Sequence, residues 1–452
     1  MPSTPSATLD SIASCFEGIL PATICSCSAD GMPNVTYLSI VHRIDDAHVG
    51  LSYQFFNKTR TNVLENPRVQ VIVVSPETAD QYRLDLQYER TEAEGPVFQR
   101  MSTRLAAVAS QTGMSQIFKL RGVDVYRVLE IRPVNAEAGA EAGPPPEYLA
   151  RIESVTEQLA ACADLDALLE AALERLSTLF GYAHSFVMVP DEDGARLYTI
   201  ASRGYDTSGI GSEVWTGEGM LGVAAARRMI VLTTSMTRER VLSRAVRSSI
   251  ERRGHDHLLE REIPLPGLPH IESQVVVPLV ARGALLGILC IQSPEIGRFR
   301  ADDERVMQIV ARHLAASMAT LWSPLPPEPH PAAGASPAAA KATSGATSTM
   351  THYQSDDSIF IDDAYLIKGV AGRILLKLLR SHDQEGRVQF TNREIRLDAS
   401  LQLPDIKDNL EARLILLRRR LDDRCGFVKL VPEGRGKLRL EIRRRLVLVE
   451  RP

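Results

Sequence analysis

The chain has 452 residues, which is too long for one ordinary hydrophobic core and suggests about three domains of roughly 150 residues each. A hydrophobic content of 44% and a charged content of 24% are typical of globular proteins. Apolar runs all fall well short of the roughly 18 residues of a membrane helix, which argues against a membrane-spanning protein. Residues 1–10 also lack the cationic start and apolar core of a signal peptide, so we expect a cytoplasmic location.

Charge is distributed unevenly along the chain. The formal net charge is -4, but residues 353–452 hold 21 Lys and Arg against 16 Asp and Glu. A basic C-terminal segment on an acidic body suits a protein in which only the last domain meets a polyanion. The six cysteines are scattered without the spacing of a metal site, so we expect free thiols and no bound metal.

Two segments of biased composition divide the chain. Residues 136–146 are Ala, Glu, Gly and Pro without periodicity, and residues 323–352 are rich in Pro, Ala, Ser and Thr. Such segments bury too little apolar surface to offset the entropy lost on ordering, so both are expected to be linkers, the second one disordered. The sequence therefore predicts a multidomain α+β protein with domains at 1–135, 147–322 and 353–452.

The first block has the pattern of a β-rich domain. Only one strong helix is expected, around residues 58–66, among short segments rich in Val, Ile and Tyr that predict strands at 22–28, 34–43, 48–53 and 68–74. This order, with Pro-Asn-Val-Thr-Tyr-Leu-Ser at 33–39 and Phe-Asn-Lys-Thr at 56–59, resembles the pyridoxamine 5′-phosphate oxidase-like split β-barrel. The resemblance covers residues 14–133.

The resemblance implies a flavin mononucleotide (FMN) site at the start of the short helix, with the strand at 35–39 beside the isoalloxazine ring. A lysine, a hydroxyl and backbone N–H groups at a helix start are also a suitable phosphate site on physical grounds. A deazaflavin, haem or an empty barrel are the alternatives. The Arg-rich substrate segment of the family's oxidases is missing after Pro133, which argues against pyridoxal phosphate synthesis. The expected cofactor residues are Lys58, Thr59, Asn57, Asn62, Tyr37 and Ser39.

The middle block contains Glu-Gly-Met-Leu-Gly at 218–222 before a helix of small residues, and its end carries a hairpin over 273–292 and an amphipathic helix at about 302–321. These motifs closely resemble a GAF domain, an α/β sandwich that acts as a sensor and dimerisation module. The ligand differs between members of that family, so the resemblance implies a small-molecule ligand without naming it. Trp215 and Met220 border the segment that usually walls the pocket, with core packing as the alternative for both.

The third block contains a predicted basic helix, followed by a predicted hairpin whose turn contains glycines. Apolar residues recur at intervals of three and four residues from Leu403 to Leu421, which predicts a helix with one apolar face. Three arginines occupy positions 418–420, and Gly-Arg-Gly-Lys-Leu follows at 434–438. From 407 to 445 there are 13 Lys and Arg against 6 Asp and Glu. This order resembles the response-regulator (OmpR-type) winged helix-turn-helix over residues 369–442.

The winged-helix resemblance implies DNA binding. Lys437 replaces the family's wing tyrosine, and Ile415 and Leu416 are apolar where the family is usually polar, which suggests a protein contact at that point. A solvated charged face in a small interaction domain is the alternative interpretation. The implied groups are Lys407, Asn409, Glu411 and Arg413 toward the major groove, Arg418 and Arg419 near phosphates, and Arg435 and Lys437 in the wing.

Together these patterns predict a ligand- or redox-responsive transcriptional regulator with a flavin-type barrel, a GAF sensor and a winged-helix output. A homodimer is expected, because both families usually pair and the helical regions 152–180 and 302–321 have apolar stripes. The first alternative is a flavin-dependent oxidoreductase that the GAF domain regulates. The second is a signalling protein whose C-terminal domain binds protein rather than DNA.

Overall fold

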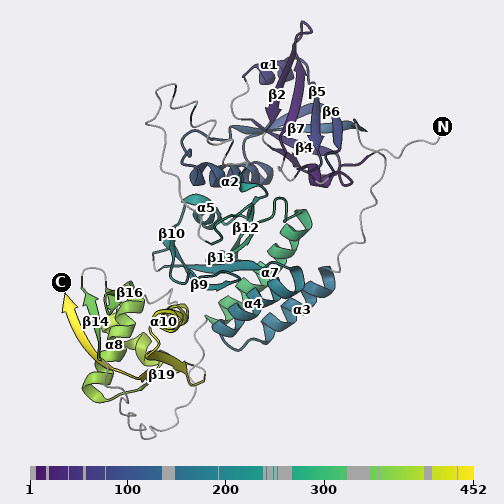
Figure 1. Ribbon diagram of the computed structural model, residues 1–452. Helices are drawn as coiled ribbons and strands as arrows, with labels where there is room; N and C mark the ends of the chain where they lie inside the picture. Colours follow the sequence, from purple (N-terminus) through teal and green to yellow (C-terminus); the bar gives the residue numbers. More distant parts are fainter. Residues whose placement is uncertain are drawn as a thin grey trace.

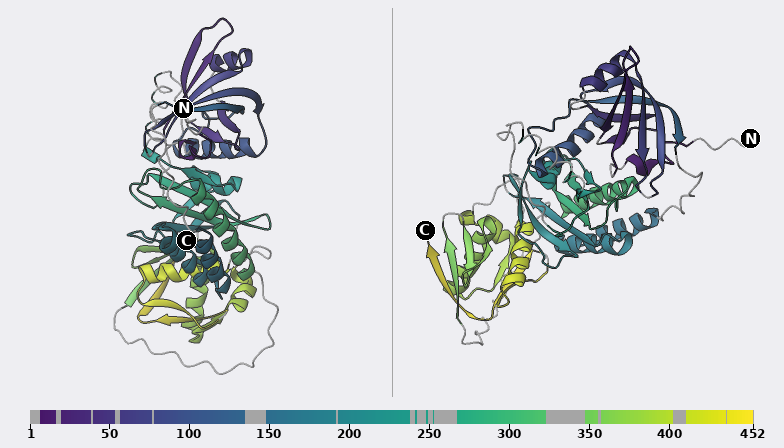
Figure 2. Two further views of the ribbon diagram at one scale, coloured as in Figure 1. Left: turned by 90° about the vertical axis from the view of Figure 1, so that its right-hand side faces the viewer. Right: turned by 45° about the horizontal axis from the view of Figure 1, so that its top comes forward.

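The computed structural model shows three domains in a row, with the middle domain between the other two (Figures 1 and 2). Helix α2 lies between the N-terminal and middle domains, and helix α10 lies between the middle and C-terminal domains (Figure 1). The structure describes residues 7–16, 20–38, 40–53, 57–76, 78–134, 148–191, 193–237, 241, 248, 252, 267–322, 347–354, 357–401, 410–434 and 436–451.

The N-terminal domain is a curved antiparallel sheet of seven strands in the order β2-β1-β5-β6-β7-β4-β3, consistent with a split barrel. Alternation places Val69, Val71 and Val73 of β5 in the core, where they pack with Leu84 and Leu86 of β6. Helix α1 (Asn57–Glu65) packs against β1 and β2. The strands are β1 (Ala22–Cys27), β2 (Pro33–Leu38), β3 (Val41–Arg43), β4 (His48–Tyr53), β5 (Arg68–Val74), β6 (Gln81–Glu92) and β7 (Gly122–Pro133).

A second helix in this domain, α2 (Pro96–Gln111), was not expected from the sequence. It begins after Gly95, whose φ is +94°, and Pro96 occupies its first turn, where a missing N–H costs nothing. Its buried face is made largely of small and polar residues, so the helix has few of the large apolar residues that mark most buried helices. The helix forms because it is covered on both sides, by the barrel and by the middle domain.

The middle domain is a six-stranded antiparallel sheet in the order β10-β9-β8-β13-β12-β11 with helices on both faces. Helices α3 (Tyr148–Ala161), α4 (Leu165–Phe180) and α7 (Ala301–Leu321) cover one face, and α5 (Gly219–Arg227) covers the other beside α2 (Figure 1). The apolar run at 152–180 forms two helices, because the Asp164 carboxylate caps α4 by accepting from the Ala167 N–H at 2.9 Å. The strands are β8 (His184–Pro190), β9 (Arg196–Arg203), β10 (Glu213–Trp215), β11 (Val231–Thr233), β12 (Ser273–Ala281) and β13 (Ala284–Ser293).

In the part of the C-terminal domain that the structure describes, two small sheets combine with the helices α8 (Gly369–Glu385), α9 (Asn392–Leu397) and α10 (Leu410–Arg424). One sheet has the order β16-β15-β14-β20, and the other has the order β17-β19-β18. The hairpin of β18 and β19 follows α10 directly in the chain. The strands are β14 (Thr347–Tyr353), β15 (Ser358–Ile361), β16 (Ala364–Ile367), β17 (Gln389–Thr391), β18 (Val428–Pro432), β19 (Lys437–Ile442) and β20 (Arg445–Arg451).

The linker that the sequence predicts at 323–352 is too long at its C-terminal end. Its last residues belong to β14, which starts at Thr347 and pairs in parallel with β20 from Thr347↔Arg445 to Tyr353↔Arg451. The segment is Thr- and Ser-rich and has little apolar signal of its own, so its strand conformation depends on a partner strand at the far end of the domain. The C-terminal domain therefore begins before residue 353.

His42 lies near two arginines of α2, and its titration is predicted to make the stability of the N-terminal domain depend on pH. Burial, followed by the charges of Arg100 and Arg104 on α2, lowers the pKa of His42 from 6.5 to about 4. The unfolded chain therefore takes up this proton at a higher pH than the folded chain, and stability is lost as the pH falls from about 6.5 to about 4. We predict that His42→Gln removes about 3 kcal/mol of this pH-dependent loss.

Urea unfolding of the N-terminal domain in wild type and variant, at neutral pH and near pH ~4.5, measures the difference. Equal pH dependence in the two proteins would contradict the assignment to His42.

Candidate functional site

The start of α1 gathers the polar residues expected to bind a cofactor phosphate. Thr59 and Asn62 are buried, and Lys58 is exposed in the first turn. The Asn34 side chain donates to Thr59 Oγ1 at 2.9 Å, and the Asn62 side chain donates to Ser26 Oγ at 3.2 Å. Lys58, Thr59 and Asn62 therefore lie on one short helix with a fixed hydroxyl beside the lysine.

The other expected cofactor residues have different outcomes. Tyr37 lies on β2 with 71% of its surface exposed, so it faces outward rather than into the barrel. Ser39 and the side chain of Asn57 lie outside the described residues.

The barrel interior next to α1 is filled by a polar cluster that the sequence did not predict. Arg60 pairs with Asp124, and Arg60 and Asp124 both bind the Thr91 hydroxyl, at 3.0 and 2.6 Å. The space left between these groups and the surrounding apolar side chains is about 20 Å³. This volume is far too small for a flavin ring, whereas the donors at the start of α1 do suit a phosphate. A flavin on this domain would therefore have its ring outside the barrel.

The two residues expected in a GAF pocket have different surroundings. Met220 is 1% exposed and packs in a core shared with Ala107 and Val108 of α2, as the core-packing alternative predicts. Trp215 is half exposed, and the Arg196 guanidinium lies 4.2 Å from the centre of its ring.

Helix α2 reaches the middle domain through specific hydrogen bonds as well as apolar packing. The Gly219 N–H at the start of α5 donates to Ser110 Oγ at 2.7 Å, and Arg227 donates to Ser102 Oγ at 3.0 Å. Ser110 thus satisfies an N–H at the first turn of a helix that has no side-chain cap of its own. The barrel domain therefore contributes to the stability of α5.

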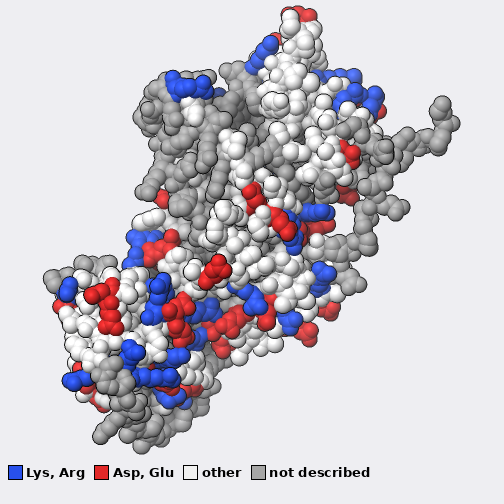
Figure 3. All heavy atoms as spheres, viewed as in Figure 1, with Lys and Arg blue, Asp and Glu red and all other residues white. Residues whose placement is uncertain are grey.

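Helix α10 is held against α4 of the middle domain by ion pairs. Arg418 and Arg419 both pair with Asp166, the latter at 2.8 Å, and Arg419 also approaches Glu170 at 3.4 Å. Arg419 donates in addition to the Ile200 carbonyl of β9 at 2.9 Å. Basic and acidic side chains gather along this junction between the two domains (Figure 3). The two arginines expected near DNA phosphates thus meet carboxylates of the same chain.

Apolar contacts and a hydrogen bond extend this docking along α10. Ile415 and Leu416 are buried, and Leu416 lies close to Gly211 in the loop before β10. The Ser208 hydroxyl donates to the Asp423 carboxylate at 2.5 Å. The apolar departure from the winged-helix pattern therefore coincides with a protein contact, made here within the chain.

The remaining residues expected at DNA are placed as follows. Arg413 is only 5% exposed, so it does not face solvent in this arrangement. Glu411 and Lys437 line a cleft of about 720 Å³ between α10, the start of α4 and the β18–β19 hairpin. Lys407, Asn409 and Arg435 lie outside the described residues.

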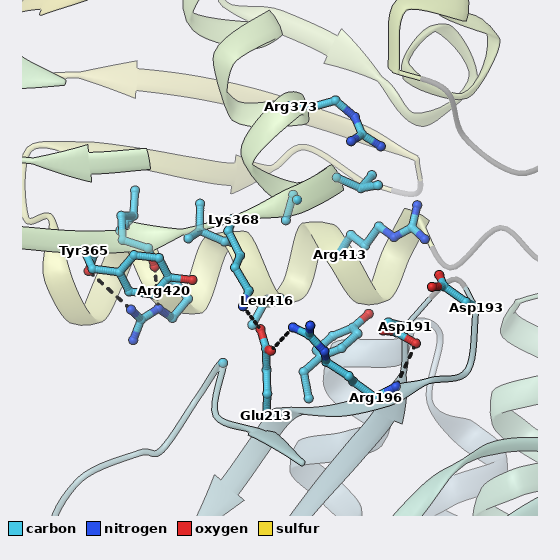
Figure 4. Close-up of a pocket in the computed structure, with 17 residues that line it drawn as sticks. Asp191, Asp193, Arg196, Glu213, Tyr365, Lys368, Arg373, Arg413, Leu416 and Arg420 are labelled. Carbon is cyan, nitrogen blue, oxygen red and sulfur yellow. Dashed lines mark hydrogen bonds and ion pairs between the residues drawn. The ribbon is translucent and has the colours of Figure 1, made fainter. Parts of the chain in front are cut away.

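A second cavity, of about 450 Å³, opens between the middle and C-terminal domains on the other side of α10 (Figure 4). The loop after β8 and strands β9 and β10 form one wall, and strand β16, the start of α8 and one side of α10 form the other. Arg196 and Lys368 both pair with Glu213, at 2.8 and 3.1 Å, so this carboxylate connects the two walls.

Within the described residues, no group of three or more His, Cys, Asp or Glu is arranged to hold a metal ion. None of the six cysteines, all of which are among the described residues, forms a disulfide. Where the structure describes helices, none is both long enough and apolar enough to cross a membrane.

Residues 9–138 match the family model "Pyridoxamine 5'-phosphate oxidase", and residues 164–318 match the model of the GAF domain. The chain therefore carries a pyridoxamine 5′-phosphate oxidase-type domain followed by a GAF domain. No match was found among curated proteins.

Solved structures with similar parts include the GAF domain of a phosphoenolpyruvate-protein phosphotransferase from Acinetobacter, with 16% identity, a TM-score of 0.31, and 38% of this chain and 93% of that chain covered. An FMN-binding protein from Syntrophomonas wolfei subsp. wolfei has 19% identity and a TM-score of 0.24, covering 28% of this chain and 86% of its own. Free methionine-R-sulfoxide reductase from Neisseria meningitidis has 16% identity and a TM-score of 0.32, covering 42% of this chain and 98% of its own.

Proposed function

We propose that the chain is a cytoplasmic, signal-responsive regulator in which the GAF domain controls access to a DNA-binding helix, α10. The observation that carries this proposal is the pairing of Arg418 and Arg419 with Asp166 and Glu170. The order of elements in the C-terminal domain supports it, because a basic third helix followed by a hairpin is the arrangement in which a winged helix binds DNA.

The docked arrangement and DNA binding would be mutually exclusive. Arginine binds carboxylates and phosphates through the same fork of N–H groups, so Asp166 and Glu170 compete for the groups that would meet the DNA backbone. Arg413, which the winged-helix resemblance places at base edges, is buried in the docked arrangement. The docked chain should therefore bind DNA weakly, and a signal would act by favouring an undocked arrangement.

Removing the competing carboxylates should strengthen DNA binding. We predict that the double variant Asp166→Asn, Glu170→Gln binds duplex DNA roughly tenfold more tightly, as for a competent state raised from about a tenth of the molecules to nearly all of them. Glu174→Gln, on an exposed position of the same helix, is the control and should leave binding unchanged. Fluorescence anisotropy with a mixed-sequence duplex, repeated at several salt concentrations, measures the effect.

A salt-dependent affinity that is equal in wild type and double variant would show that docking does not restrict α10. If neither protein binds DNA at low salt, the C-terminal domain has another target, and a protein partner becomes the preferred alternative.

The barrel domain is proposed to bind a phosphate-bearing flavin on its surface, with the phosphate at the start of α1. Lys58 supplies a cation there, Thr59 a hydroxyl, and the helix its first backbone N–H groups. When bound, FMN would give the chain a redox-active group, and the residues named here would hold its phosphate. The exposed ring of Tyr37 gives the adjoining surface an aromatic side chain.

We predict that Lys58→Ala weakens FMN binding roughly tenfold to a hundredfold, since it removes a charge-assisted hydrogen bond to a dianion. Lys119→Ala, which removes another exposed lysine of the same domain, is the matched control. Flavin absorbance after denaturation and dialysis against known FMN concentrations gives the occupancy. Equal occupancy in the two variants would remove Lys58 from the site, and no flavin in any of the proteins would favour an empty barrel.

A homodimer is proposed to form through the outer surface of the barrel. Met32, Val35, Tyr37 and Leu64, on the β1–β2 hairpin and α1, are all more than half exposed, which is unusual for four large apolar side chains so close in the fold. The helix layer of the GAF domain is less available than the sequence suggested, because α10 covers part of α4.

Light scattering at micromolar concentration should give the mass of a dimer for wild type and of a monomer for Val35→Asp, because a charge in an apolar interface would be left unpaired. The control Thr36→Asp changes the neighbouring position on the opposite face of the strand. A wild-type monomer, or a Val35→Asp dimer, would contradict this interface.

A further inference from the structure

The cavity between the GAF and C-terminal domains has the size of a small-molecule site. Its volume of about 450 Å³ lies within the range of ligand pockets. Both domains contribute walls, so its shape exists only while α10 is docked. Figure 4 shows Arg373 and Arg413 projecting toward the same end of this space from two different helices.

The lining of this cavity is rich in cations. Five basic side chains line it, Arg196, Lys368, Arg373, Arg413 and Arg420, against the three carboxylates of Asp191, Asp193 and Glu213. Glu213 is shared by two of these cations, whereas Arg373 pairs with Asp357, which lies outside the lining, at 2.7 Å. The lining therefore carries two more cations than carboxylates, and an anion in the cavity would offset this excess of positive charge.

The start of α8 strengthens the preference for an anion. Residues 368–371 all line the cavity, and Lys368, at the N-cap position, makes no side-chain capping hydrogen bond. Gly369 has a φ of +65°, and a Cβ at this position would meet nothing within 4 Å, so the backbone is open on this side. The first N–H groups of a 17-residue helix therefore add to the positive potential of the arginines.

We propose that this cavity binds a small phosphorylated anion that contacts both domains, through Arg196 on the GAF side and through Lys368, Arg373 and Arg413 on the C-terminal side. Several guanidinium groups along one cavity suit the multiple charges of a phosphate ester or pyrophosphate better than a single carboxylate. Because the ligand would touch both walls, its binding would stabilise the docked position of α10. Binding itself does not depend on whether the C-terminal domain recognises DNA.

The test is isothermal titration calorimetry of the full-length protein with inorganic pyrophosphate at low ionic strength. We expect saturable binding that Arg373→Gln weakens roughly tenfold, as for one lost charge-assisted hydrogen bond. Arg380→Gln is the matched control, because it lies on the same helix and also pairs with a carboxylate, Glu450, but does not line the cavity. Its affinity should equal that of wild type.

A second variant is expected to strengthen pyrophosphate binding, and a gain of affinity cannot result from a loss of folding. Asp193→Asn removes a negative charge from the lining, so pyrophosphate binding should tighten severalfold. Absence of binding by wild type, equal weakening in Arg373→Gln and Arg380→Gln, or no tightening in Asp193→Asn would each overturn the proposal. Pyrophosphate binding without any DNA binding would leave the anion site intact and reject only the proposed DNA target.

Discussion

The position of the C-terminal domain depends on two carboxylates near the start of one helix, Asp166 and Glu170 of α4, and the arginines that they hold on α10. Arg419, at 16% exposure, and Asp166, at 24%, are largely but not fully buried, whereas Glu170 is 70% exposed. Ion pairs in such a setting are worth more than exposed pairs, yet removing one partner leaves the other in a poorly solvated place. The junction is therefore suited to a switch between two arrangements.

The GAF domain lies between two contacts of different character. On one face of its sheet, α5 meets the barrel through Ala107, Val108 and the Ser110 hydroxyl, in an interface dominated by small apolar side chains. The helices of the other face meet α10 through charges, beside the buried apolar side chains of Ile415 and Leu416. Apolar packing holds the barrel to the GAF domain largely independently of salt, whereas the charged junction responds to ionic strength and to competing anions. Of the two junctions, the charged one is the more readily opened.

Much of the fold could be predicted from local sequence patterns. The alternation in β5, the turn signals of the first block and the GAF motifs at 218–222 and 273–292 all describe elements that the structure contains. Helix α2 and strand β14 could not be found in this way. The buried face of α2 is made largely of small and polar residues, and β14 depends on pairing with β20, so both owe their conformation to tertiary contacts.

The candidate site was likewise predictable only where local sequence patterns describe it. The sequence shows that Arg418 and Arg419 form a basic face, but not what that face meets, because Asp166 lies 253 residues before Arg419 in the chain. Ile415 and Leu416 were a usable signal for a protein contact, since apolar residues on a DNA-facing helix are unusual. The polar cluster of Arg60, Thr91 and Asp124 gave no such signal, because its members come from three separate elements.

The docking of α10 on the GAF domain can be tested directly with a cysteine pair at Ser208→Cys and Asp423→Cys, whose native side chains are in hydrogen-bond contact. Under mild oxidation of the full-length protein, mass spectrometry should find a disulfide between peptides containing positions 208 and 423 within single chains. The single-cysteine variants control for the native thiols. Rapid intramolecular crosslinking is the result expected for a docked α10. Failure to form this crosslink, while the protein remains folded, would contradict the docked arrangement on which the proposed regulation depends.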